Sequence, residues 1–250
     1  MLLLSRRTLL LSGGAALLAG CRVDVISNPD PDPPGPNPPS TVRLDFSFAN
    51  GLAGWEAAYA DYSLGQEASI GFAFDHERLP APLDALSGLY LSSDNRSDDV
   101  FMYISRLVDG LAPNRRYRID TRIDIATNVP PGCPGAGGSP GESVYVKAGG
   151  AGTRPEKIVQ GSFVTVNFDK GAQSTGGPNA FVIGDIAQST PGGGCLNAPY
   201  QRKSLATGAN GPTVTTDSSG RLWLVIGTDS GFEGFTKLYY LDGRATLTPV

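Results

Sequence analysis

Strict alternation of apolar and polar residues constrains the fold more than any other feature of the sequence. In segment 42–48 every even-numbered residue is apolar and every odd-numbered residue is polar. A longer run, 116–125, puts charged residues at every even position and apolar residues or Thr121 at every odd one. Successive side chains of a β-strand point to opposite faces, so both runs predict strands with one buried face.

Other short segments complete an all-β pattern. The remaining strand candidates are 69–74, 88–93, 100–106, 143–148, 162–168, 180–186, 213–217, 221–228 and 236–247, the last interrupted at Asp242–Gly243. None precedes a long helical period, and 33 glycines and 20 prolines supply turns. Asp217 and Gly220 are expected to close a tight turn between neighbouring strands. The sequence predicts one antiparallel β-sandwich or barrel over residues 41–250.

Charge and histidine content exclude several functions. His76 is the only histidine, so a zinc site with two or three histidine ligands is excluded, and a Ser-His-Asp hydrolase would need His76 as its base. The chain has 20 basic and 24 acidic residues and a net charge of -4. It therefore lacks the basic surface typical of nucleic-acid binding, and no nucleic-acid partner is expected.

Residues 1–20 have the features of a bacterial signal peptide. Two arginines precede an apolar stretch, 8–19, that is too short to span a bilayer. Residues 18–21, LAGC, resemble the lipobox of bacterial lipoproteins, which implies cleavage before Cys21 and lipidation of its thiol. Residues 5–10 also resemble the twin-arginine export motif, with general secretion as the alternative route.

A proline-rich segment follows the predicted lipid anchor. Residues 22–40 contain seven prolines, which favour an extended tether, together with Cys21, in front of the folded domain. A proline-rich ligand for a partner domain is the alternative. The resemblance to lipoproteins implies anchoring to the bacterial cell envelope, and Arg22 after the acylated residue favours the outer membrane or cell surface over the inner membrane.

Two cysteines remain once Cys21 is assigned to lipid. Cys133 and Cys195 both lie in Gly/Pro-rich segments. In an oxidising compartment an even pair of this kind predicts a disulfide.

Two short segments resemble jelly-roll carbohydrate-binding modules. Segment 48–55, FANGLAGW, is similar to the end of their first strand, and segment 238–242, LYYLD, is similar to their last strand. The resemblance implies a jelly-roll-like β-sandwich, and Asp242 and Asp45 are candidates for the structural Ca²⁺ site of such modules.

Further candidate ligands lie in one acidic cluster and one aromatic cluster. Asp94, Asp98 and Asp99 offer oxygen ligands for Ca²⁺, with a solvated turn as the alternative. Trp55, Tyr59 and Tyr62 are candidates for stacking on a sugar ring, although Trp55 would equally serve to plug the edge of the sandwich.

The expected function is binding of a glycan or another polymer of the cell envelope by a lipid-anchored domain. The alternatives are a carbohydrate lyase or hydrolase that uses Glu142, Asp169 and Asp185, and a structural or assembly lipoprotein with a protein partner. Catalysis is less expected than binding, and the ligand itself is not identified by the sequence.

Overall fold

The alternating segments form antiparallel strands. The computed structural model describes residues 40–96, 99–189 and 194–250. The predicted signal peptide, Cys21 and the tether up to residue 39 lie outside these residues, as does Asp98. The strands are β1 (Val42–Ser47), β2 (Glu56–Ala60), β3 (Tyr62–Ser63), β4 (Ala73–Arg78), β5 (Ser87–Asp94), β6 (Val100–Val108), β7 (Arg116–Thr127), β8 (Val144–Ala151), β9 (Lys157–Gln160), β10 (Phe163–Val166), β11 (Ala180–Asp185), β12 (Gln201–Ala206), β13 (Thr213–Thr215), β14 (Leu222–Ser230) and β15 (Phe235–Pro249).

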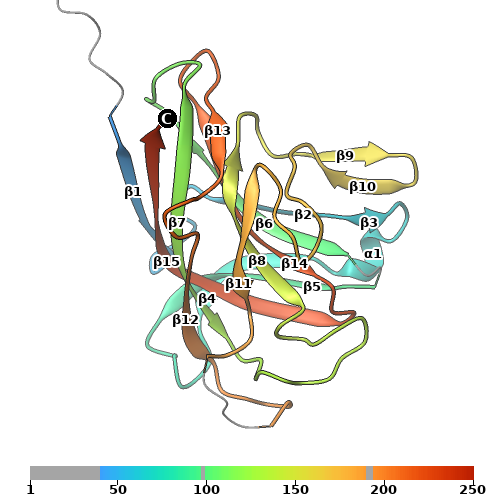
Figure 1. The fold of residues 1–250 in the computed structure, drawn as a ribbon. Helices are drawn as coiled ribbons and strands as arrows, with labels where there is room; N and C mark the ends of the chain where they lie inside the picture. The colour runs from blue at the N-terminus through green and yellow to red at the C-terminus, as the bar shows by residue number, and fades with distance from the viewer. Residues whose placement is uncertain (1–39, 97–98, 190–193) are drawn as a thin grey trace, which may run out of the picture. The chain divides into compact units, whose positions relative to one another are not determined.

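The strands build two large sheets and one small one (Figure 1). Sheet A has the order β12-β7-β15-β5-β4, with β1 also paired to β15 and β13 to β7. Sheet B has the order β11-β8-β14-β6-β2, and sheet C the order β3-β10-β9. All of these pairs are antiparallel. The predicted all-β, antiparallel β-sandwich is confirmed.

One hydrophobic core joins sheets A and B. It contains the apolar positions of the long alternating run on β7, such as Ile119 and Ile125, together with Val146 of β8 and Ile226 of β14. The polar positions of the same run include Arg118 and lie on the opposite, outer face of sheet A. The period-two pattern therefore placed the buried face correctly.

The outer face of sheet B, opposite the core, is partly covered. Phe101 and Tyr103 of β6 pack there with Val225 of β14, Val166 of β10 and Phe168. Phe168 belongs to the loop between β10 and β11, residues 167–179. Sheet C and this 167–179 loop thus cover one part of the outer face and leave another part open.

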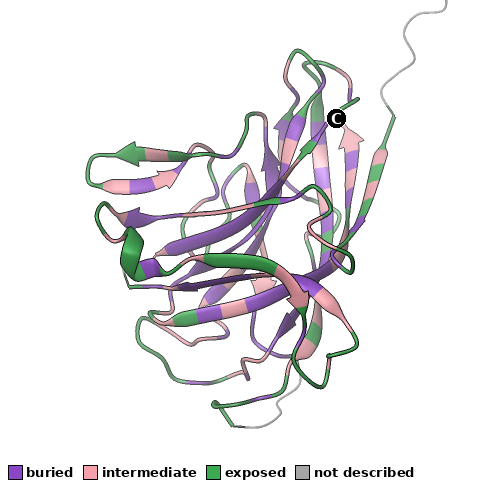
Figure 2. Cartoon of the chain, turned by 180° about the vertical axis from the view of Figure 1, so that it is seen from behind, coloured by how far each residue is buried: buried purple, intermediate pink, exposed green. Residues whose placement is uncertain are grey.

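The structure corrects two local predictions. Segment 69–74 is not one strand, because the helical turn α1 (Glu67–Ile70) precedes β4 and ends at Gly71, whose φ of 55° is left-handed. Figure 2 shows α1 as exposed except at its end, where Ile70 is buried. The turn at Asp217 and Gly220 forms, with the Gly220 amide donating to the Asp217 carbonyl at 3.0 Å. Its flanking strands are not paired, however, because β13 belongs to sheet A and β14 to sheet B.

The interruption predicted at Asp242–Gly243 is absent, because both residues pair within the one long strand β15, and a β-bulge lies just before them. The register of β15 against β7 shifts between Tyr240 and Asp242. A bulge of this kind bends a strand without ending it.

Among the described residues, no helix has the length and apolar composition needed to cross a membrane.

Candidate functional site

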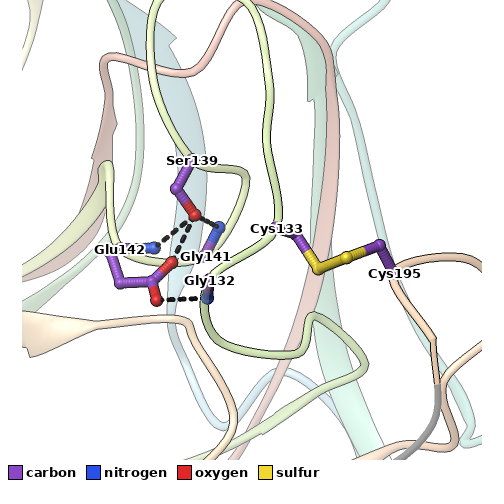
Figure 3. Close-up of a disulfide and its surroundings, with 6 residues drawn as sticks. All are labelled: Gly132, Cys133, Ser139, Gly141, Glu142 and Cys195. Atoms are coloured by element: carbon purple, nitrogen blue, oxygen red, sulfur yellow. Dashed lines mark hydrogen bonds between the residues drawn. A yellow bond between two sulfur atoms is a disulfide. The ribbon is translucent and has the colours of Figure 1, made fainter.

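The predicted disulfide is present. Cys133 and Cys195 are bonded, with their Cα atoms 5.6 Å apart (Figure 3). On the Cys133 side, the Glu142 carboxylate accepts hydrogen bonds from the Gly132 amide at 2.6 Å and from the Ser139 hydroxyl. The disulfide and the Glu142 contacts together fix a loop that has little apolar surface of its own.

The three carboxylates of the enzyme alternative have separate structural partners. Glu142 holds the disulfide loop, and Asp169 accepts a hydrogen bond from the Gly171 amide at 2.9 Å. Asp185 forms an ion pair with Lys203 at 2.7 Å. His76 contacts the main-chain oxygen of Phe48 at 2.8 Å through Nε2. None of these contacts pairs two of the three acids for acid and base catalysis.

The aromatic candidates are mostly buried. Trp55 is 3% exposed and packs on Phe46 with ring centroids 4.9 Å apart, as the edge-plug alternative expected. Tyr62 is also 3% exposed, and Tyr59 stacks between Tyr62 and Phe72 at 5.2 and 4.7 Å. Trp55 and Tyr62 therefore present no open ring face to a sugar in this structure.

The calcium candidates Asp45 and Asp242 are bound by arginines. They line a hollow of about 320 Å³ on sheet A. Asp45 pairs with Arg43 and with Arg244, whose hydrogen bonds hold the pKa of Asp45 below its usual value. Asp242 pairs with Arg202 at 2.6 Å. These guanidinium groups take the place beside the carboxylates that a calcium ion would need.

The other calcium candidate comprises Asp94, Asp98 and Asp99, of which the structure describes Asp94 and Asp99. These two residues interact with different partners. Asp94 pairs with Arg96 at 3.6 Å. The carboxylate of Asp99 instead lies within 4.8 Å of those of Asp61 and Asp229. This group of three carboxylates also contains lysine ammonium groups, which lie between the acids.

We name these residues the buried charge cluster: Asp61, Asp99, Lys147, Lys170 and Asp229. The Lys170 ammonium lies 2.7 Å from Asp61 and 2.6 Å from Asp229, and the Lys147 ammonium lies 2.8 Å from Asp229. The side chains of Lys147 and Asp229 are 0% exposed. Two ammonium groups thus supply the positive charge that a metal ion would bring to three carboxylates.

Burial changes the acidity of this cluster. Burial, and then the charge of Asp229, raise the pKa of Asp99 to about 8, which favours its protonated form. Burial lowers the pKa of Lys147. The pKa of Lys170 is raised: burial opposes its charge, but Asp229 and Asp61 outweigh that effect. The charged form is therefore favoured at Lys170, whereas Lys147 is the more easily deprotonated lysine.

The open part of the same outer face contains two adjoining hollows. One, of about 310 Å³, lies between β2, β6 and segment 154–157. The other, of about 370 Å³, lies beside β14, and both are lined by Arg154. We name the two hollows together the outer groove. Its lining residues are 56–58, Tyr103, Ser105, Leu107, 152–157, Asp217, Arg221 and Trp223.

The outer groove combines an aromatic ring with polar groups. Trp223 is half-buried, and the Arg154 guanidinium lies 5.6 Å from the centre of its ring. Arg154 also pairs with Glu56 at 2.7 Å. The hydroxyl of Tyr103 is buried and has no hydrogen-bond partner among the described residues. A buried hydroxyl without a partner carries a desolvation cost that a ligand hydroxyl would relieve.

Sequence reasoning did not identify this groove. Trp223 lies on the outer face of β14, since its neighbours Leu222 and Leu224 join the core. The signal available was that alternation, which turns Trp223 away from the core. Neither cysteine of the disulfide lines the groove.

Comparisons with known proteins give weak structural similarities. No family model and no curated protein matches the sequence. The K1 cleaved adhesin domain of Lys-gingipain from Porphyromonas gingivalis aligns over 82% of this chain and 97% of its own, with 11% identity and a TM-score of 0.37. A carbohydrate-binding module that recognises mannan aligns over 82% of this chain and 97% of its own, with 12% identity and a TM-score of 0.38. A module from Caldicellulosiruptor saccharolyticus, in complex with mannohexaose, aligns over 81% of this chain and 96% of its own, with 9% identity and a TM-score of 0.33. Similarities at this level identify neither a family nor a ligand.

Proposed function

We propose that the chain is a glycan-binding domain and that the outer groove is its binding site. The observation that carries this proposal is that Arg154 lies over the half-buried ring of Trp223 and also lines the hollow of Tyr103, whose hydroxyl is buried and unpartnered among the described residues. A pyranose stacks one face on an aromatic ring, and a few polar groups then fix its hydroxyls. Arg154 and Glu56 lie within the same groove and supply a donor and an acceptor.

The charges of the groove favour an uncharged polymer. Arg154 is already paired with Glu56, and Arg221 is paired with Asp217 at 3.0 Å. An acidic sugar would have to break one of these pairs to gain a new one, whereas a neutral sugar can bond to both members. The two adjoining hollows suit a chain of sugars better than a single residue.

A panel of neutral and acidic envelope polysaccharides tests the proposal. Binding of the domain to each polysaccharide is measured by affinity electrophoresis and calorimetry, with and without calcium. Trp223→Ala is expected to weaken binding about tenfold or more, since loss of a stacked ring costs about 1 kcal/mol beyond its lost contact area. Binding without dependence on Trp223, or no binding to any polymer in the panel, would contradict the proposal and favour a protein partner.

Tyr103 offers a sharper test with a matched control. Tyr103→Phe removes a hydroxyl that costs stability in the free protein, so the variant is expected to be as stable as the wild type or more stable, yet to bind more weakly. Tyr240 is also buried with an unpartnered hydroxyl, but it lies in the core. Tyr240→Phe is therefore expected to leave binding unchanged.

The lipid anchor at Cys21 belongs to the same proposal. Lipid would fix the N-terminus in the envelope membrane, and the proline-rich tether, at about 3.1 Å per residue, would give the domain a reach of roughly 50 to 60 Å. Cys21→Ala is expected to move the exported protein from the membrane fraction to the soluble fraction. Retention of Cys21→Ala in the membrane fraction would contradict the lipid anchor. That result would not affect the proposal that the outer groove binds glycan.

A further inference from the structure

The buried charge cluster is not used by the proposed function. It lies on the outer face of sheet B, where Asp229 of β14 is paired in register with Phe101 of β6, and the 167–179 loop covers it. Burial of charges costs several kcal/mol per ion unless their partners compensate fully. Within the cluster, both oxygens of Asp61 and one oxygen each of Asp99 and Asp229 are buried without a well-oriented hydrogen bond among the described residues, although the Lys170 ammonium lies 2.7 Å from Asp61. The ion pairs are therefore incompletely compensated.

Lys147 is held against Asp229 in one arrangement. Its ammonium lies 2.8 Å from Asp229 Oδ2 and donates to the main-chain oxygens of Lys170 at 2.9 Å and of Thr175 at 3.1 Å, and also to that of Ala172. All three carbonyls belong to the 167–179 loop. A lysine amine fixed beside a carboxyl group meets the proximity requirement for an intramolecular reaction.

The two lysines differ in their suitability as nucleophiles. Lys170 lies between Asp61 and Asp229, whose charges keep it protonated. Lys147 contacts a single carboxylate, and burial favours its neutral amine. A buried, desolvated lysine is the form of this side chain that acts as a nucleophile.

Asp99 supplies a proton to the same place. Its carboxyl group lies within 4.8 Å of that of Asp229, in a cluster whose Lys170 ammonium lies 5.1 Å from the centre of the Phe101 ring. Burial and the charge of Asp229 raise the pKa of Asp99 and so favour its protonated form. An acid of this kind donates to a departing oxygen and takes a proton back, as general acid and base.

We propose that Lys147 and Asp229 form a covalent amide bond between β8 and β14 after the domain folds. Lys147 passes one proton to the carboxyl groups of the cluster, and its Nζ attacks Cγ of Asp229. A C–N bond forms, one C–O bond of Asp229 breaks, and its oxygen leaves as water with protons relayed through Asp99.

The reaction balances without another reactant. One ammonium and one carboxylate give one secondary amide and one water, and Asp99 ends with the proton it held at the start. The product replaces two buried charges with a neutral group, which removes their desolvation cost. The amide N–H keeps one donor for the carbonyls of the 167–179 loop.

The mass of the purified chain tests the proposal. After reduction of the disulfide, the intact mass is expected to be lower than the sequence mass, corrected for N-terminal processing, by one water molecule. Trypsin is expected to leave Lys147 uncut, because its amine is acylated. Segment 123–157 should then be recovered covalently joined to segment 222–237, which contains Asp229.

Variants assign the roles of the cluster. Lys147→Arg keeps the charge but should restore the full mass. Asp99→Asn keeps the shape but removes the proton carrier, so it should also restore the full mass or slow the loss of water at least tenfold. Lys203→Arg is the control, because Lys203 pairs with Asp185 outside the cluster, and this variant should still lose water. The intact disulfide and the circular dichroism spectrum report whether each variant folds.

Three results would overturn the proposal. The first is a wild-type chain at full mass with Lys147 open to trypsin, which would leave the cluster as a set of ion pairs. The second is a crosslink that carries Lys170 in place of Lys147. The third is loss of water at an Asp-Gly sequence, such as Asp109–Gly110 or Asp242–Gly243, with no joined peptides. The wild-type measurement alone decides these cases, so failure of a variant to fold does not affect them.

Discussion

Removal of the disulfide is expected to lower the stability of the fold by about 4 kcal/mol. The perturbation is the double variant Cys133→Ser, Cys195→Ser, which leaves no free thiol in this part of the chain. The bond closes a loop with a sequence separation of 62. A crosslink over a loop of this size restricts the unfolded chain by about 14 cal/mol/K, or about 4 kcal/mol at 25 °C.

The folded state should change little, for a structural reason. Glu142 still holds Gly132 and Ser139 when the disulfide is absent, so the Cys133 loop keeps its conformation. The effect therefore acts on the unfolded state. Because typical domains have 5 to 15 kcal/mol in total, the variant should remain folded at room temperature with a much smaller margin.

Guanidinium titration of the wild type and the double variant, followed by tryptophan fluorescence, measures the difference. The variant is expected to have a lower midpoint and a larger m-value, because its unfolded chain expands further. A loss of free energy below about 1 kcal/mol would refute the chain-entropy argument. Loss of glycan binding by the folded variant would refute the placement of the binding site in the outer groove, which neither cysteine lines.

Two other predictions concern the core and the acid stability. Trp55→Ala should lower the free energy of unfolding by about 3 to 5 kcal/mol, because the ring is buried against Phe46. The same guanidinium titration measures this loss. A loss below about 1 kcal/mol would mean that the ring is not in the core. For Asp124, burial raises the pKa, but hydrogen bonds from Ser204 and Arg202 outweigh it and hold the pKa below its usual value. The folded state therefore binds fewer protons than the unfolded chain, so this stabilisation is present above about pH 4 and is lost as the pH falls through the folded-state pKa. Asp124→Asn should flatten the acid limb of stability against pH, and an unchanged slope would contradict the assignment.

The sequence predicted the parts of the fold that depend on alternation. The run on β7 gave both the strand and its buried face, because a strand exposes its two faces to different surroundings. It did not predict that β13 and β14 would lie in different sheets. A turn signal such as Asp217 with Gly220 reports only the local backbone, and the pairing of a strand depends on residues far away in the chain.

The candidate sites were harder to predict for the same reason. Lys147 alternates with the core residues Val146 and Ala148, a pattern typical of a lysine in solvent. The 167–179 loop buries it, and no local pattern at Lys147 reports that loop. The outer groove likewise needs strands and loops from four distant segments, so Trp223 alone carried no signal of a site.

The pairing of β1 has a mechanical consequence for a domain held by its N-terminus. Within the described residues β1 pairs with β15 alone, and its first residue, Val42, lies opposite Leu247. Tension applied ahead of Val42, while a ligand held sheet B, would load the hydrogen bonds of this ladder one after another, starting at that end. The β1–β15 ladder is then the first strand pairing in the path of force from the N-terminus.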